Sequence, residues 1–292
     1  MAARRGATFR RRELGRELRR LREAKGLTQE DVAQRLGFSA TKLARAELGE
    51  IDLPRTTDLE DLMTLYDVID KGDRETLLQL HRESLSKDPW TPYKGVMPSK
   101  MPTYRGLEEA ASAMRAFQPD VVFGILQTEA YTRALFQLAK PIDETTSEFI
   151  ETNTKLRLER KELITRTDSP LELRVVMDEA ALSRMVGGPE IMRAQYDEVI
   201  ELSKLENVTV QVLPTSTVTY RARSNFIILD FPDDVDSVVQ IDLPNTISVT
   251  DEPRAVANSV RGFDVMRESA LAPVATPEFL YQLTQGWMSH RY

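Results

Sequence analysis

Hydroxyl, ammonium and guanidinium side chains gather within positions 39 to 45 of the sequence. Ser39 and Thr41 carry the hydroxyls, Lys42 and Arg45 carry the positive charges, and the small Ala40 lies beside them. Such donors can bind phosphate oxygens, and a Lys or Arg that reaches the edge of guanine discriminates between bases by roughly 1–3 kcal/mol. This chemistry requires a helix that keeps one face outward.

Two short helices joined by a tight turn are predicted to hold these side chains. Thr28 is a suitable N-cap, and Asp31 three positions later completes a capping-box pattern. Gly37 provides the left-handed residue that ends the first helix. Ser39 can cap the second helix. The segment therefore contains the signals for two helix N-termini and one helix C-terminus.

The apolar residues of this segment repeat at helical spacing. Val32, Ala33 and Leu36 give the first helix an apolar face, and Leu43 and Ala46 do the same for the second. The arrangement is typical of a helix-turn-helix, whose second helix lies in the DNA major groove. Capped helix pairs around a glycine also occur in bundles that bind no DNA, so that alternative stays open.

The flanking sequence extends the unit to a bundle of four or five helices. A basic helix containing Leu14, Leu18 and Leu21 precedes it, and helices at about 56–68 and 74–86 follow. The whole chain has a net charge of −7, yet residues 1–45 hold 13 Lys and Arg against 5 Asp and Glu. A local excess of positive charge suits contact with phosphates. The alternative is an ordinary solvated arginine face.

The wider pattern includes Leu-Arg-Arg-Leu-Arg-Glu-Ala-Lys-Gly-Leu-Thr-Gln at 18–29, then Ala33, Leu36, Gly37, Ser39, Leu43, Glu47, Gly49, Pro54, Leu59, Leu62 and Tyr66. With these residues the span 18–68 resembles the phage-repressor-like, or XRE-type, helix-turn-helix family. One departure is Ala46, where the family usually has a larger apolar residue.

The resemblance implies roles for individual residues. It implies that Gln29 contacts phosphate, that Ala40, Thr41, Lys42 and Arg45 face base edges, and that Arg22 and Glu47 form a structural ion pair. We also expect Arg19 to contact phosphate. Because helix-turn-helix proteins usually bind DNA as symmetric dimers, we expect a homodimer on double-stranded DNA.

The composition of the chain and a proline-rich segment indicate its domain organisation. At 292 residues, 41% apolar and 29% charged, the chain is typical of a two-domain globular protein. It has no cysteine, no apolar stretch long enough to span a membrane and no secretory signal, which fits a cytoplasmic protein. We predict a disordered basic tail at 1–8, a DNA-binding domain at 9–87, a Pro-rich linker at 88–105 and a sensor and dimerisation domain at 106–292.

The second domain is predicted to have a mixed sheet covered by helices, α/β or α+β. Helices are expected at 106–117, 128–139, 144–166, 178–185, 190–205, 254–271 and 277–288, and strands at 171–177, 207–213, 226–231 and 238–243. Segments 123–134, 178–182, 186–189, 192–195 and 207–214 resemble the C-terminal domain of WhiJ-type actinobacterial regulators. That resemblance implies control of development or secondary metabolism, and partnership with a small companion protein in an antitoxin-like layout.

Residues suited to catalysis are few. His81 and His290 lack metal-ligand partners at helical spacing and are expected at the surface. Asp178 and Glu179 fit a helix start, and the Gly-Gly-Pro at 187–189 fits a plain loop. We therefore expect no catalytic residue, no metal and no cofactor. The loop 214–225, which carries Tyr220, Arg221 and Arg223, is either a ligand or partner site or a mobile connection.

These observations predict a sequence-specific transcriptional regulator whose second domain responds to a small protein or ligand. One alternative is an antitoxin-like interaction protein that neutralises a small partner and binds DNA only for autoregulation. Another is an enzyme acting on a nucleotide or NAD-like ligand, with DNA binding as targeting. Co-purification of a companion protein would indicate the first alternative, and stabilisation by nucleotides the second.

Overall fold

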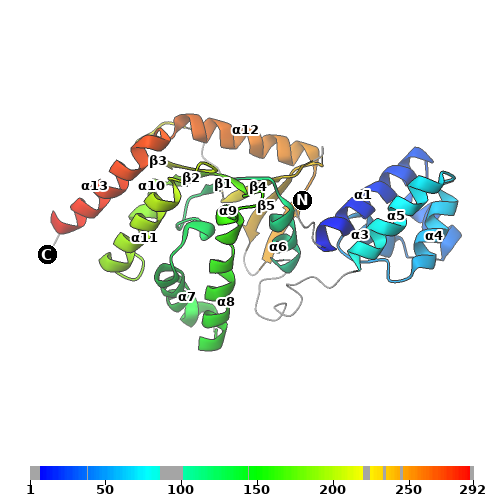
Figure 1. Cartoon of the computed structure of the whole chain (residues 1–292), viewed down its shortest axis with the longest axis horizontal. Coiled ribbons are helices and arrows are strands. Elements are labelled where there is room, and N and C mark those ends of the chain that lie inside the picture. Colours follow the sequence, from blue (N-terminus) through cyan, green and yellow to red (C-terminus); the bar gives the residue numbers. More distant parts are fainter. Residues whose placement is uncertain are drawn as a thin grey trace. The chain divides into compact units, whose positions relative to one another are not determined.

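The computed structural model describes residues 7–37, 39–85, 101–143, 145–219, 224–232, 235–243 and 246–289, with side chains to 285. These residues form two compact units (Figure 1). A helical N-terminal region is followed by an α/β domain with a six-stranded mixed sheet, which confirms the predicted fold class.

The N-terminal unit is a bundle of helices around one apolar core. Its helices are α1 (Ala7–Ala24), α2 (Gln29–Leu36), α3 (Ala40–Glu47), α4 (Thr56–Leu65) and α5 (Lys71–Ser84). The core includes side chains from all five, among them Leu14, Leu18, Val32, Leu43, Leu59, Leu62 and Leu77. These are the positions that the helical spacing marked as apolar faces.

Two boundaries differ from the sequence expectation. Helix α1 begins at Ala7, inside the predicted tail, because Phe9 is buried and needs an ordered turn before it. Helix α6 (Met101–Ala110) starts within the predicted linker, and Pro102–Ala110 groups with the N-terminal unit. Residues 88–100 of the predicted linker lie outside the described residues.

The second unit is built on a sheet of strand order β3-β2-β1-β4-β5-β6. The strands are β1 (Ala113–Gln118), β2 (Glu172–Asp178), β3 (Val208–Leu213), β4 (Phe226–Asp230), β5 (Val238–Leu243) and β6 (Thr246–Thr250). The first three are parallel, and β4, β5 and β6 pair antiparallel. In the central strand β1, Phe117 lies opposite Val176 of β2 and Phe226 of β4.

Helices cover both faces of this sheet (Figure 1). Helix α12 (Pro253–Ser269) runs along one face, where Phe263 and Met266 pack against Phe117, Phe226 and Ile228. The other side carries η2 (Gly124–Leu126), α7 (Glu129–Asp143), α8 (Ser147–Glu159), α9 (Glu162–Thr165), α10 (Glu179–Ser183) and α11 (Pro189–Leu202). Because both faces are covered, the central strands are apolar on both sides.

The edge strand β3 is covered by the chain that follows α12. Leu271 N donates to the Val212 carbonyl oxygen at 2.8 Å, and Thr276 Oγ1 donates to the Val210 carbonyl oxygen at 2.8 Å. The elements here are η3 (Pro273–Ala275) and α13 (Thr276–Ser289). Bonding of the edge removes a row of unpaired backbone groups that would otherwise invite another strand.

Two predicted elements of this domain are corrected, and one strand is added. The helix expected at 106–117 is instead the end of α6 and the central strand β1, because sheet pairing on both sides overrides the helical propensity of its Ala, Met and Arg residues. The single helix expected at 144–166 divides into α8 and α9. Strand β6 was not predicted, since it is short and closely follows β5.

Candidate nucleic-acid interface

The turn between α2 and α3 has the caps that the sequence predicts. Thr28 Oγ1 accepts from Asp31 N at 3.1 Å, and Asp31 Oδ2 accepts from Thr28 N at 2.8 Å. Gly37 ends α2 with φ 67° and ψ 23°, and Ser39 Oγ accepts from Lys42 N at 3.0 Å. The bonds from Thr28 lower the pKa of Asp31 below its usual value. The start of α3 is therefore fixed by local hydrogen bonds.

Helix α3 is seated against α1 through backbone contact. A methyl group added to Gly15 would meet the carbonyl oxygens of Ala46 and Glu47 in the last turn of α3. On the inner side of α3, Leu43 is 0% exposed and Ala46 is 4% exposed. The small Ala46, a departure from the XRE-type pattern, is accommodated within this packing. The role of Gly15 could not be predicted from the sequence, because a glycine inside a helical pattern has several explanations.

A buried ion pair joins the end of α3 to the end of α1. Arg22 Nε donates to Glu47 Oε1 at 2.7 Å, and Nη2 donates to Oε2 at 3.0 Å. The side chains are 9% and 1% exposed. Hydrogen bonding to Glu47 raises the pKa of Arg22, and burial, with Glu47 close by, raises the pKa of Tyr66. The structure thus places Arg22 and Glu47 together, as the resemblance implies.

Gln29 is bonded to the same carboxylate. Its Nε2 donates to Glu47 Oε2 at 2.8 Å. Gln29 is the first residue of α2, so Glu47 joins the start of α2 and the last turn of α1 to the end of α3. The side-chain amide that was expected to contact phosphate therefore positions Glu47 in this structure.

The outward face of α3 divides the predicted base-reading residues into two groups. Ser39, Thr41 and Arg45 are exposed, and Ala40 is half-buried. Lys42 instead reaches α4, where its Nζ lies 3.0 Å from Oδ2 of the buried Asp58. Sequence spacing places Lys42 on the surface of α3, yet only the orientation of α4 reveals its partner.

The two arginines predicted to contact DNA form exposed ion pairs within the domain. Arg45 Nε lies 3.3 Å from Glu50 Oε2, and the side chains are 52% and 41% exposed. Arg19 Nε lies 2.9 Å from Glu23 Oε1, one helical turn away, and this bond raises the pKa of Arg19. Exposed pairs of this kind contribute roughly 0–1 kcal/mol, so a phosphate or a base can replace the carboxylate at little cost.

Other arginines of α1 serve the bundle itself. Arg10 lies 2.6 Å from Glu83 of α5, and Arg11 lies 2.5 Å from Asp52. His81 of α5, expected at the surface, is 1% exposed, and its Nε2 lies 2.6 Å from the Leu53 carbonyl oxygen. Part of the positive charge that the sequence assigns to a DNA footprint therefore anchors α1 to its neighbours.

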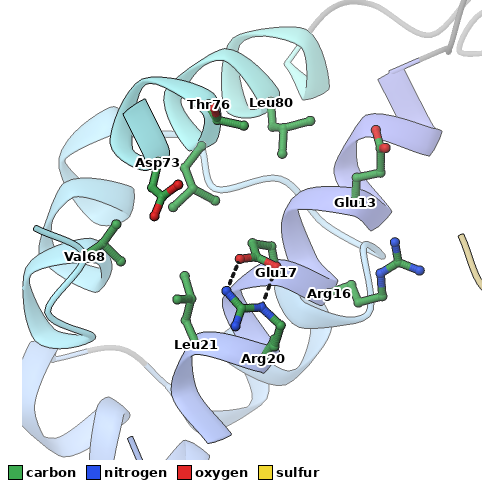
Figure 2. A pocket seen from close by; sticks show the side chains of 10 residues that line it. Glu13, Arg16, Glu17, Arg20, Leu21, Val68, Asp73, Thr76 and Leu80 are labelled. Carbon is green, nitrogen blue, oxygen red and sulfur yellow. Dashed lines mark hydrogen bonds and ion pairs between the residues drawn. The ribbon is translucent and has the colours of Figure 1, made fainter. Parts of the chain in front are cut away.

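A cavity of about 310 Å³ lies between α1 and α5, lined in part by Glu17, Arg20, Leu21 and Leu80. Figure 2 shows Arg20 and Glu17 joined across one turn of α1. At 100° per residue these positions fall on the side of α1 away from Gly15 and α3. The cavity is therefore separate from the outward face of α3.

The candidates in the second domain mostly have structural partners. Asp178 caps α10 by accepting from Ala180 N at 2.9 Å, and Glu179 accepts from Thr215 N at 2.8 Å. Gly188 is the N-cap of α11, and Pro189 is its first residue. The loop residues Tyr220, Arg221 and Arg223 and the C-terminal His290 lie outside the described residues.

Within the described part of the chain, no group of three or more His, Cys, Asp or Glu is arranged to hold a metal ion. No helix among those described has the length and apolar character needed to cross a bilayer.

Comparison with protein families agrees with this geometry. A model described as a helix-turn-helix domain matches residues 13–77. Together with the capped α2–α3 unit, this match defines a DNA-binding regulator of the helix-turn-helix class. A second model, described as the domain of unknown function DUF5753, matches residues 101–282, and the chain belongs to this family. No curated protein and no solved structure matches the chain.

Proposed function

We propose that this chain is a sequence-specific transcriptional regulator that binds double-stranded DNA as a homodimer through α3. The observation that carries the proposal is the contrast between the two sides of α3. Its inner side is seated against Gly15 and locked at Glu47, whereas Ser39, Thr41 and Arg45 are exposed on its outer side. A rigid helix that exposes polar side chains is suited to the major groove.

Within this proposal, Arg45 is the main base-reading residue. Its guanidinium pairs with the exposed Glu50, and a bidentate contact with guanine is worth roughly 1–3 kcal/mol of discrimination. Lys42 is a weaker candidate because it is bonded to the buried Asp58, which also pairs with Arg55 at 2.9 Å. We therefore assign Lys42 mainly to the junction of α3 and α4.

Control through the second domain is part of the proposal. The resemblance to XRE-type and WhiJ-type regulators supports a role in development or secondary metabolism, with a small ligand or companion protein acting on residues 111–289. The proposal includes no catalytic step. A regulator acts where its DNA lies, so we place it in the cytoplasm, at the nucleoid.

The test begins with selection of bound sequences from random DNA by the full chain. A dimer should select an inverted repeat whose half-sites lie about one helical turn apart. We then expect Arg45→Ala to abolish the preference for selected over scrambled DNA and to leave weak, salt-dependent binding. Arg82→Ala, which removes an exposed arginine of α5, is the matched control. Unchanged discrimination in Arg45→Ala would refute the assignment.

A further inference from the structure

Two arginines of α8 and its C-cap meet the segment that follows β1. Arg157 Nη1 donates to Gln127 Oε1 at 3.2 Å, and its guanidinium carbon lies 4.7 Å from the centre of the Phe136 ring. Arg160 packs against Gly124, where an added methyl carbon would lie 2.8 Å from Nη1. Gly124 therefore makes room for a guanidinium, and two positive charges converge on residues 124–127.

This segment is held rigidly by buried polar groups. Gln195 of α11 accepts from Thr128 N at 2.8 Å and donates to the Leu126 carbonyl oxygen at 2.7 Å. The Tyr131 hydroxyl accepts from Val122 N at 3.1 Å. Gln127, the partner of Arg157, is 1% exposed. A site built on such a network needs little ordering when a ligand binds.

Arg157 has no carboxylate partner among the residues that the structure describes. Burial lowers the pKa of Arg157 to about 10, and the charge of Arg160 acts in the same direction. The charge of Asp242 of β5 opposes this effect, but no ion pair joins it to Arg157 among the described residues, and its oxygens accept from Asn225 and Gln240. An anion at this guanidinium would supply the counter-charge that no described carboxylate provides at ion-pair distance.

A second polar group on the same face of α8 is also unmatched. Thr154 lies one turn before Arg157, is 2% exposed, and its Oγ1 has no hydrogen-bond partner in the described structure. By contrast, Arg157 is only half-buried, so solvent still reaches it. The face therefore combines unmatched polar groups with access from outside.

The position in the fold is one where α/β proteins bind ligands. Gln118 ends β1, and Asn225 precedes β4, its antiparallel neighbour. Strands β2 and β3 lie on one side of β1 in the sheet. After β3 the chain crosses to β4, which lies on the other side of β1. In open α/β sheets, ligands bind outside the carboxyl ends of the strands, where the order reverses.

We propose that Arg157, with Arg160 close by, binds the carboxylate or phosphate group of a small organic anion at the carboxyl end of β1. This inference deepens the proposed control through the second domain, on which its regulatory meaning rests, by naming the class of ligand. Binding itself is measured without DNA, so the two proposals can fail separately.

The first experiment probes the native full chain with phenylglyoxal, which modifies guanidinium groups, and measures each arginine by peptide mass spectrometry. Inorganic phosphate and malonate are the probes, at matched ionic strength. At a probe concentration about tenfold above its Kd, we expect modification of Arg157 to slow about tenfold. Arg174 of β2, with a 48% exposed side chain, should be unaffected. Protection by one probe alone identifies the preferred anion, and protection by neither overturns the proposal.

The second experiment compares variants by calorimetric titration with the protecting probe. Arg157→Gln should weaken binding about ten- to hundredfold, because it removes charge-assisted hydrogen bonds, whereas Arg174→Gln should bind as the native chain does. Equal affinity in the two variants would overturn the proposal. If Arg157→Gln does not fold, the protection measured on the native chain still decides the question. Native affinity for selected DNA with no anion binding would defeat this inference alone, and the converse would defeat the proposed function alone.

Discussion

Removal of the Glu47 carboxylate should loosen the attachment of helix α3 to the N-terminal bundle. In Glu47→Ala, the Arg22 guanidinium loses both bonds to that carboxylate and keeps its bond to the Leu27 carbonyl oxygen at 2.7 Å, and Gln29 Nε2 loses its bond to Glu47. Because Arg22 is 7% exposed, its buried positive charge is left with the exposed Glu23, whose Oε1 lies 3.5 Å from Nη2, as a weak counter-charge. Loss of one partner from a buried pair typically costs about 3–5 kcal/mol, a large part of the roughly 5–15 kcal/mol of a whole domain.

Hydrogen exchange resolved on peptides of α1 and α3 is the appropriate assay, because a chain of two compact units need not unfold in one step. The expected cost corresponds to roughly a hundredfold or greater loss of protection. Glu50→Ala removes a carboxylate whose side chain is 41% exposed and should change the opening free energy by less than about 1 kcal/mol.

A double variant separates the buried charge from the lost packing. Arg22→Met combined with Glu47→Leu removes both charges and retains apolar volume, so it should recover much of the protection lost in Glu47→Ala. Equal protection in Glu47→Ala and Glu50→Ala would refute the view that this pair locks α3.

Three further outcomes are expected. Arg19→Ala should weaken binding to all DNA sequences alike and reduce the salt slope by about one, as measured by binding at several salt concentrations; an unaltered slope would rule out a phosphate contact. Thr28→Ala should destabilise the N-terminal unit by about 1 kcal/mol in hydrogen exchange, because α2 loses its N-cap. NMR titration of the Asp31 carboxyl should give a pKa below 3.8, and the stabilisation from this carboxylate should be lost as pH falls through that lowered pKa. A measured pKa at or above 3.8 would contradict the capping-box bond.

The helix-turn-helix is predictable from sequence because its signals are local. Thr28 and Asp31, Gly37 and Ser39 each act within one turn of the chain, and the structure has each of them in the expected role. Lys42 could not be placed in the same way. Its partner Asp58 belongs to another helix, and only the packing of α4 against α3 decides which side the ammonium group takes.

Less of the second domain could be predicted from the sequence. Apolar strands such as Val208–Leu213 are recognisable by composition, but β1 was mistaken for a helix because its residues favour helices in isolation. Arg157 gave no signal at all, since its importance depends on Gln127 and Phe136, which are brought beside it by α7 and the segment after β1. Sites assembled from several elements need the fold before they can be found.

The contact of Gly15 with the last turn of α3 has an evolutionary consequence. Because the helices meet there through main-chain atoms, the seat of α3 does not depend on the identity of its solvent-facing residues. A duplicated gene can therefore exchange Ser39, Thr41 and Arg45 and acquire a new operator without redesigning its scaffold. Diversification of targets among paralogues should then concentrate at these few codons, while the glycine stays unchanged.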